Sequence, residues 1–458
     1  MIKKNEEYVV DIIDNGFQGE GIAKIEGITV FIDQAIKGEK IKIKILKVQK
    51  NFAYGKIVEF IEKSSTRVEP DCTTYNRCGG CNLRHIEYNE TLKIKKSIVQ
   101  NCMNKTLKRE IKINDVIGME NPLHYRNKLQ YPLGLDEQNN PVMGVFSART
   151  HNIIPIQKCF IQNEKCEEIA KDIFKFIKQN NISVYNEKTL KGTVRHIVIR
   201  IGIKTNEILV TLVLNDNKLK DKELVQYIIE KHPEVKTIVK NFNTKNTNVI
   251  LGDKTEVIYG EGYIYDALGD YKFKISPLSF YQVNPLQTEI LYNTAIQFAE
   301  NNSNNQNNIA LDLYCGIGTI GIFAAKYFKK IYGIEIIEEA IKDAKENAKI
   351  NKIENAEFYA GDVEELLPKI IEKENIKPNV VFVDPPRKGL DTKTIEVLKG
   401  LKPEKIVYIS CNPATLSRDL ALLDETYKIK EVQPVDMFPF SKHVECVVVL
   451  NLKQSTVL

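Results

Sequence analysis

The second half of the chain constrains the fold most, because from residue 309 onward short apolar runs alternate with helical segments. Strands that are buried on both faces and separated by helices are typical of a doubly wound α/β sheet. In such sheets ligands bind beyond the carboxyl ends of the strands. We therefore expect a Rossmann-like sheet with its functional residues at those ends. The expected strands are residues 309–313, 330–335, 357–359, 380–383, 406–410 and 444–450.

A chain of 458 residues is too long for one hydrophobic core, and its patterning predicts three domains. Residues 1–62 show short β-type runs broken by glycine, which indicates a small OB-like β-barrel. Residues 63–262 predict a central α+β domain, in which a helix over 88–107 could pack against either neighbouring domain. Residues 263–458 form the expected α/β domain, where the polar tract 301–308 predicts a surface loop.

Lysines alternate with isoleucines at residues 41–45, so one face of this strand meets a core and the other presents positive charge. Such lysines either protect an edge strand from pairing or lie along a phosphate backbone. The net charge of +5 permits a polyanionic partner without requiring one. The chain has no apolar run long enough to span a membrane and no hydrophobic stretch of the signal-peptide type. We therefore expect a cytoplasmic protein with no membrane partner.

A glycine-rich turn follows the first strand of the expected sheet, with G-x-G-x-x-G at residues 316–321. Both a dinucleotide and S-adenosylmethionine fit such a turn, but the carboxylate of Asp312 favours the cationic S-adenosylmethionine. Glu335, at the end of the next strand, can accept hydrogen bonds from ribose hydroxyls of either cofactor. Asp384 ends the fourth strand and is followed by two prolines that stiffen a turn into the cleft, a feature that dehydrogenases do not need. These residues predict an S-adenosylmethionine pocket.

Cys411 follows the fifth strand and precedes Asn412 and Pro413, a good N-cap and first helical residue. A helix N-terminus lowers the pKa of a thiol and favours the reactive thiolate. Thiolate addition to carbon 6 of uracil would make carbon 5 nucleophilic toward the methyl sulfonium, after which a base must remove the carbon 5 proton. Glu445 and His443 are both candidates for that base, and the residues alone do not separate them.

Three cysteines, Cys72, Cys78 and Cys81, lie close together beside glycines. In a reducing compartment such a group indicates metal binding rather than disulfides. Tetrahedral zinc and a [4Fe-4S] cluster both require four ligands, and the single C-x-x-C pair disfavours a two-knuckle zinc site. Cys159 and Cys166 are the two options for the fourth ligand, and their spacing does not choose between them.

Together these motifs resemble the RNA uracil-C5 methyltransferases of the RumA and TrmA type, over nearly the whole chain. The resemblance implies an N-terminal TRAM domain, a class I methyltransferase sheet, Cys411 as the nucleophile and Glu445 as the base. It implies a [4Fe-4S] cluster whose fourth ligand is Cys159. The segment 280–284 resembles a family segment whose glutamine contacts the cofactor. The implied S-adenosylmethionine-binding residues are Gln282, Tyr314, Glu335 and Asp384, and the implied iron ligands are Cys72, Cys78, Cys81 and Cys159.

Three positions depart from the family pattern: Arg84 stands where glutamine is expected, and Phe440-Ser441 replaces a polar residue and threonine. By the same resemblance, the cluster and barrel favour 23S ribosomal RNA over transfer RNA as the partner of an enzyme expected to be monomeric, and the target uridine should be flipped out. Residues 125–128 and Arg149 are candidate contacts to the RNA backbone. Three alternatives remain: a transfer-RNA uracil-C5 methyltransferase, an amino-group methyltransferase that needs no thiolate, and a non-catalytic iron-sulfur RNA-binding protein.

Overall fold

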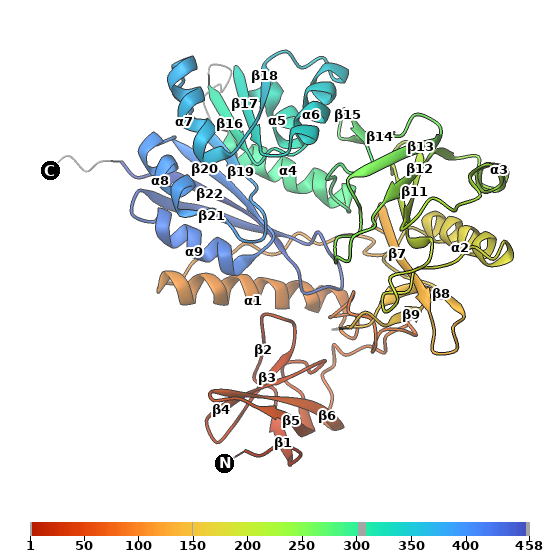
Figure 1. The fold of residues 1–458 in the computed structure, drawn as a ribbon. Helices are drawn as coiled ribbons and strands as arrows, with labels where there is room; N and C mark the ends of the chain where they lie inside the picture. The colour runs from red at the N-terminus through yellow and green to blue at the C-terminus, as the bar shows by residue number, and fades with distance from the viewer. Residues whose placement is uncertain (1, 149, 301–307, 455–458) are drawn as a thin grey trace.

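The computed structural model describes residues 2–148, 150–300 and 308–454. Arg149 and nearly all of the polar tract 301–308 fall outside these ranges. Figure 1 shows an N-terminal β-barrel on one side of helix α1 (Tyr88–Leu107) and the C-terminal sheet on the other. No helix in the described ranges is both long and apolar enough to span a membrane.

The N-terminal barrel has six strands in the order β1-β5-β6-β4-β3-β2. Its longest strands are antiparallel, and the isoleucines at 41, 43 and 45 all point inward with no exposed surface. The lysines between them face outward, as the alternation predicted. The strands are β1 (Glu7–Asp11), β2 (Asp14–Asn15), β3 (Gly21–Ile25), β4 (Ile28–Ile32), β5 (Lys40–Val48) and β6 (Phe52–Glu62).

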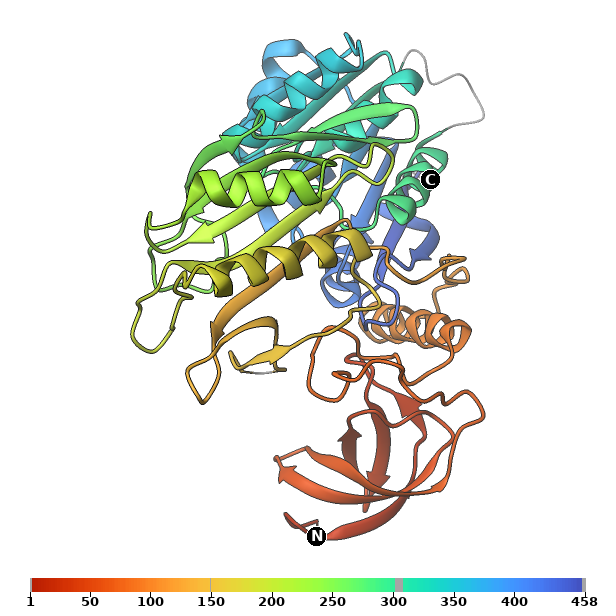
Figure 2. The same ribbon diagram turned by 90° about the vertical axis from the view of Figure 1, so that its right-hand side faces the viewer.

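The middle of the chain forms a seven-stranded mixed sheet in the order β13-β12-β11-β10-β7-β8-β9. Helices α2 (Glu164–Gln179) and α3 (Asp221–Lys231) pack together over this sheet, as Figure 2 shows. Its strands are β7 (Lys128–Leu135), β8 (Pro141–Phe146), β9 (Ile153–Pro155), β10 (Val194–Ile201), β11 (Ile208–Leu214), β12 (Val235–Phe242) and β13 (Lys254–Tyr259). A hairpin of β14 (Ile264–Leu268) and β15 (Tyr271–Ile275) then leads to the third unit.

The C-terminal sheet has the order β18-β17-β16-β19-β20-β22-β21, in which the first five strands are parallel. The Rossmann-like sheet is thus confirmed. The sequence missed β21, which pairs antiparallel at the sheet edge, because its lysines and Pro434 do not resemble a buried strand. The strands are β16 (Ile309–Leu313), β17 (Lys330–Glu335), β18 (Ala356–Ala360), β19 (Val380–Val383), β20 (Lys405–Ser410), β21 (Tyr427–Val435) and β22 (Glu445–Leu452).

Helices cover both faces of this sheet. One apolar core holds α4, α5 and α6, and the other holds α7, α8, α9 and the end of α1. Helix α1 therefore packs on the third unit, beside α9, although it lies before the whole middle sheet in the sequence. The remaining helices are α4 (Pro285–Ala299), α5 (Thr319–Ala324), α6 (Glu338–Ile350), α7 (Val363–Glu374), α8 (Thr392–Leu401) and α9 (Pro413–Leu423), with a 3₁₀ turn, η2 (Ala325–Tyr327).

Candidate active site

A pocket of about 1280 Å³ lies at the carboxyl ends of the parallel strands. It extends from the glycine turn after β16, past the ends of β17, β19 and β20, to the start of β22. The pocket brings together the cofactor and catalytic candidates that the sequence singled out, with the exception of Asp312. These lining residues are Gln282, Tyr314, Glu335, Asp384, Cys411, His443 and Glu445.

The glycine turn has a backbone that only a few residue types adopt easily. Tyr314, Gly316 and Gly318 all have positive φ, and a Cβ on Gly318 would approach the ring of Phe358 to 2.9 Å. Glu335 holds the turn in place, because its carboxylate accepts hydrogen bonds from the backbone N–H groups of Gly316 (3.2 Å) and Ile337 (3.1 Å). These hydrogen bonds fix the conformation of the turn and place the Glu335 carboxylate at the pocket wall.

Asp312 does not face the pocket as the sequence suggested. Its side chain is fully buried beneath the turn, where Oδ2 accepts a hydrogen bond from the backbone N–H of Gly321 at 2.8 Å. Burial raises the pKa of Asp312 to about 8 and that of Asp384, which does line the pocket, to about 7. Asp384 therefore remains the strand-end carboxyl that a cationic ligand could contact, while Asp312 shapes the turn.

Cys411 and Glu445 lie opposite each other because of the register between β20 and β22. These strands are antiparallel, and Ser410, the last residue of β20, pairs with Cys446. Cys411, the next residue along the chain, therefore falls opposite Glu445, the first residue of β22. Cys411 also lies at the N-terminus of α9, where the side chain of Asn412 caps the helix by accepting from Ala414 N at 3.1 Å. The sheet register, which no local motif reveals, thus pairs a thiol with a carboxyl.

The pKa of the Cys411 thiol is raised to about 11, which reverses the expectation of a lowered value. Burial is the main cause, followed by the nearby carboxyls of Glu445 and Asp384. The pKa of Glu445 is raised to about 8 by burial and by Asp384, while the Arg387 guanidinium partly opposes both shifts. The Glu445 carboxyl therefore disfavours the ionised form of the Cys411 thiol.

His443 lies on the loop before β22 rather than in the strand. Its pKa is lowered to about 4 by burial and by the cations Arg387, Lys442 and Lys95, so the imidazole is neutral at physiological pH. Arg387 was not identified as a functional residue from the sequence. It lines the pocket and its charge acts on Cys411, His443 and Glu445 alike. Its place directly after the two prolines was the signal that could have identified it.

The four residues 125–128, expected to touch RNA, divide into two groups. Tyr125 and Arg126 line the pocket. Asn127 is buried and donates a hydrogen bond from Nδ2 to the backbone oxygen of Gln282 at 3.0 Å. Burial lowers the pKa of Lys128 to about 7. Asn127 therefore supports the Gln282 segment instead of contacting a ligand, while the phosphate contact expected for Lys128 stays a prediction.

The buried carboxyls lead to a prediction for the protein without ligand. Unfolded carboxyl groups ionise at about pH 4, whereas Asp312 and Glu445 remain protonated up to about pH 8 in the folded protein. Between these values the folded state binds more protons, so stability falls as the pH rises. We expect the midpoint of thermal unfolding to decrease steadily from pH 5.5 to pH 8.5 in scanning calorimetry. The Glu445→Gln variant should show a smaller decrease, and an equal decrease in both proteins would contradict the raised pKa.

Three of the four cysteines lie in the loop before α1, and Cys159 lies in the segment between β9 and α2. Cys72, Cys78, Cys81 and Cys159 are partly exposed, and burial, together with the other three thiols, raises the pKa of Cys81. Cys166 instead is fully buried on α2, within the core of the middle sheet. Within the described ranges, no group of three or more His, Cys, Asp or Glu side chains could hold a metal ion. The four thiols are thus neighbours, but they do not form a single-ion site.

Arg84, which departs from the family pattern, has a structural role beside these cysteines. Its guanidinium pairs with Asp71 at 2.6 Å and lies over the rings of Phe160 (4.6 Å) and Phe440 (4.7 Å). Phe160 follows Cys159, and Phe440 belongs to the loop before β22. Arg84 therefore connects the cysteine segment with the loop that leads to Glu445.

Two family models together match most of the chain. A family model described as tRNA (Uracil-5-)-methyltransferase matches residues 87–453, and a TRAM domain model matches residues 3–58. An uncharacterized RNA methyltransferase of Clostridium acetobutylicum is 48% identical over 455 residues, covering 98% of both chains. One from Staphylococcus aureus strain MW2 is 44% identical over 99% of both.

Among solved structures, the chain is similar to the Pyrococcus abyssi tRNA (uracil-54, C5)-methyltransferase in complex with S-adenosyl-L-homocysteine. The TM-score is 0.76 with 27% sequence identity, and the match covers 97% of this chain and 100% of the archaeal one.

Proposed function

The chain belongs to the tRNA (uracil-5-)-methyltransferase family, the RumA and TrmA type, and from this membership we propose that it methylates carbon 5 of a uridine in RNA through Cys411 and Glu445. It is an S-adenosylmethionine-dependent RNA methyltransferase. The observation that carries the residue assignment is the register of β20 and β22, which sets a thiol opposite a carboxyl inside the pocket.

S-adenosylmethionine supplies the methyl group, and Gln282, Tyr314, Glu335 and Asp384 are the residues proposed to hold it. The Cys411 thiol loses its proton to solvent, its sulfur forms a bond to carbon 6 of uracil, and the electron pair of the C5–C6 double bond moves to oxygen 4 as an enolate. Carbon 5 then attacks the methyl carbon, whose bond to the sulfonium sulfur breaks so that S-adenosylhomocysteine leaves. Glu445 removes the proton from carbon 5, and the electrons of that C–H bond expel the Cys411 thiolate and restore the uracil ring. Arg387, near both groups, favours their anionic forms.

Three domains are proposed for these roles: residues 1–62 hold RNA, residues 63–262 carry the cysteine group, and residues 263–458 perform the transfer. The TRAM match over residues 3–58 and the outward lysines of β5 support the first assignment. Helix α1 lies in the second range by sequence but packs beside α9, so it joins the second and third domains physically.

The proposed substrate is 23S ribosomal RNA, and transfer RNA is the second candidate because the archaeal protein with the similar structure is a transfer-RNA enzyme. The purified enzyme should introduce 5-methyluridine into a 23S transcript, measured by nuclease digestion and mass spectrometry. Methylation of transfer RNA alone would establish the second candidate. Failure on both RNAs, with cofactor binding intact, would contradict the proposed function.

We also propose a [4Fe-4S] cluster on Cys72, Cys78, Cys81 and Cys159. Its support is the proximity of the four thiols and the soft sulfur ligand set, because a four-iron cluster spreads its ligands more widely than one metal ion does. Protein purified without oxygen should be brown and contain about four irons per chain. Cys159→Ser should lose iron, whereas Cys166→Ser should retain it. Stoichiometric zinc would contradict the cluster.

A further inference from the structure

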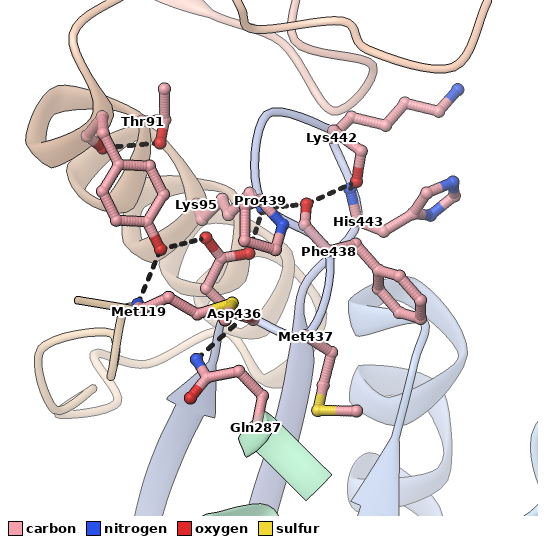
Figure 3. A network of polar contacts seen from close by, with 12 residues as sticks. Thr91, Lys95, Met119, Gln287, Asp436, Met437, Phe438, Pro439, Lys442 and His443 are labelled. Atoms are coloured by element: carbon pink, nitrogen blue, oxygen red, sulfur yellow. Dashed lines mark hydrogen bonds and ion pairs between the residues drawn. The ribbon is translucent and has the colours of Figure 1, made fainter. Parts of the chain in front are cut away.

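An ion pair is completely buried between helix α1 and the loop that precedes β22 (Figure 3). Lys95 Nζ lies 2.5 Å from Oδ1 of Asp436, and neither side chain has any exposed surface. The two residues are 341 positions apart in the sequence, and no motif links them. The pair is therefore a purely tertiary feature of the fold.

Asp436 is held from several sides. Its Oδ2 accepts a hydrogen bond from the hydroxyl of Tyr88 at 2.8 Å, and that hydroxyl accepts one from the backbone N–H of Met119 at 2.8 Å. The side chain of Gln287, on α4, donates to the backbone oxygen of Asp436 at 3.0 Å. The loop thus begins at a point that is fixed by both α1 and α4.

Lys95 also contacts the same loop at a point closer to the pocket. Its Nζ also donates to the backbone oxygen of Phe438 at 3.0 Å. The same oxygen accepts a hydrogen bond from Oγ of Ser441 at 2.8 Å, and this Oγ accepts one from the backbone N–H of His443 at 3.2 Å. Phe438, Ser441, His443 and Glu445 all line the pocket. A short chain of hydrogen bonds therefore runs from the ammonium group of Lys95 to the residues beside the base.

Stability alone does not require charges at this place, because well-packed apolar residues often replace a buried ion pair without loss. What an ammonium group supplies, and an apolar side chain does not, is donors in defined directions to both Asp436 and the Phe438 backbone. We infer that Lys95 and Asp436 are positioning residues that fix the loop 436–443, and through it the place of Glu445 in the reaction. This inference rests on the proposed role of Glu445 as the base.

The test is a double variant, Lys95→Met/Asp436→Leu, in the full-length protein. Because thiolate addition depends on Cys411 while proton removal depends on Glu445, the second step should slow selectively. We expect kcat to fall by about 100-fold, with KM for RNA and the Kd for S-adenosylhomocysteine unchanged. The covalent protein–RNA adduct should accumulate on a denaturing gel.

Lys93→Met is the matched control, since Lys93 lies on the same helix, is 75% exposed and pairs only with its helical neighbour Glu90 at 2.8 Å among the contacts described. It should leave kcat and the amount of adduct unchanged. Tyr88→Phe removes one donor to Asp436 and keeps the ring, so it should reproduce the same pattern more weakly if the double variant fails to fold.

Two results would overturn the inference: full turnover by the variants, or joint loss of cofactor binding and adduct, which would indicate a merely structural role. If Glu445→Gln also fails to trap an adduct, the proposed base itself is wrong, and the two failures are thereby distinguished.

Discussion

Replacing Cys411 by alanine should abolish methyl transfer while S-adenosylhomocysteine still binds. Without the thiol, carbon 5 of uracil cannot be activated by addition at carbon 6, and loss of a covalent nucleophile lowers turnover by roughly four to six orders of magnitude. Cys411 directly follows β20, and among the described residues no hydrogen bond joins its side chain to the glycine turn, so the cofactor side of the pocket should keep its shape. Tritium transfer from labelled S-adenosylmethionine to RNA measures the first effect, and titration calorimetry measures the second.

Cys315 offers a matched control, because it also lines the pocket but lies within the glycine turn. Its replacement by alanine should leave the formation of the protein–RNA adduct intact. Methyl transfer that survives in the Cys411→Ala protein would contradict the covalent mechanism and favour direct transfer to an amino group, which requires no thiolate.

The Glu445→Gln variant should accumulate a covalent complex with RNA. Addition of Cys411 and transfer of the methyl group precede removal of the carbon 5 proton, so loss of the base stops the reaction after the carbon–sulfur bond has formed. We expect turnover to fall by about 10²-fold to 10⁴-fold. A band that is retarded on a denaturing gel and abolished by nuclease treatment would identify the complex.

His443→Gln separates the two candidate bases, because both side chains line the pocket. The imidazole has a pKa lowered to about 4, so it is already neutral at the working pH and could in principle accept a proton. If Glu445 is the base, His443→Gln should turn over without trapping the complex. The reverse outcome, a trapped complex with His443→Gln only, would transfer the role to His443.

Local patterns predicted much of the fold. Apolar runs predicted the parallel strands of the C-terminal sheet, and the alternation at residues 41–45 predicted which side chains enter the barrel core. Edge strand β21 was missed because one of its sides faces solvent and its sequence is correspondingly polar. The orientation of Asp312 was misjudged for a related reason, since a carboxylate beside a glycine turn can face either the ligand or the backbone.

By itself, the sequence determined which residue types stand at strand ends: the glycine turn, Glu335, Asp384 and Cys411. These assignments depend on short-range chemistry, since turns, caps and strands are encoded by residues a few positions apart. Only the tertiary structure decided that Glu445 lies opposite Cys411, that the thiol pKa rises instead of falling, and that Lys95 and Asp436 meet. Strand register, burial and long-range ion pairs arise only when segments that are distant in the sequence pack together and exclude water. A local sequence pattern does not encode which distant segments will meet.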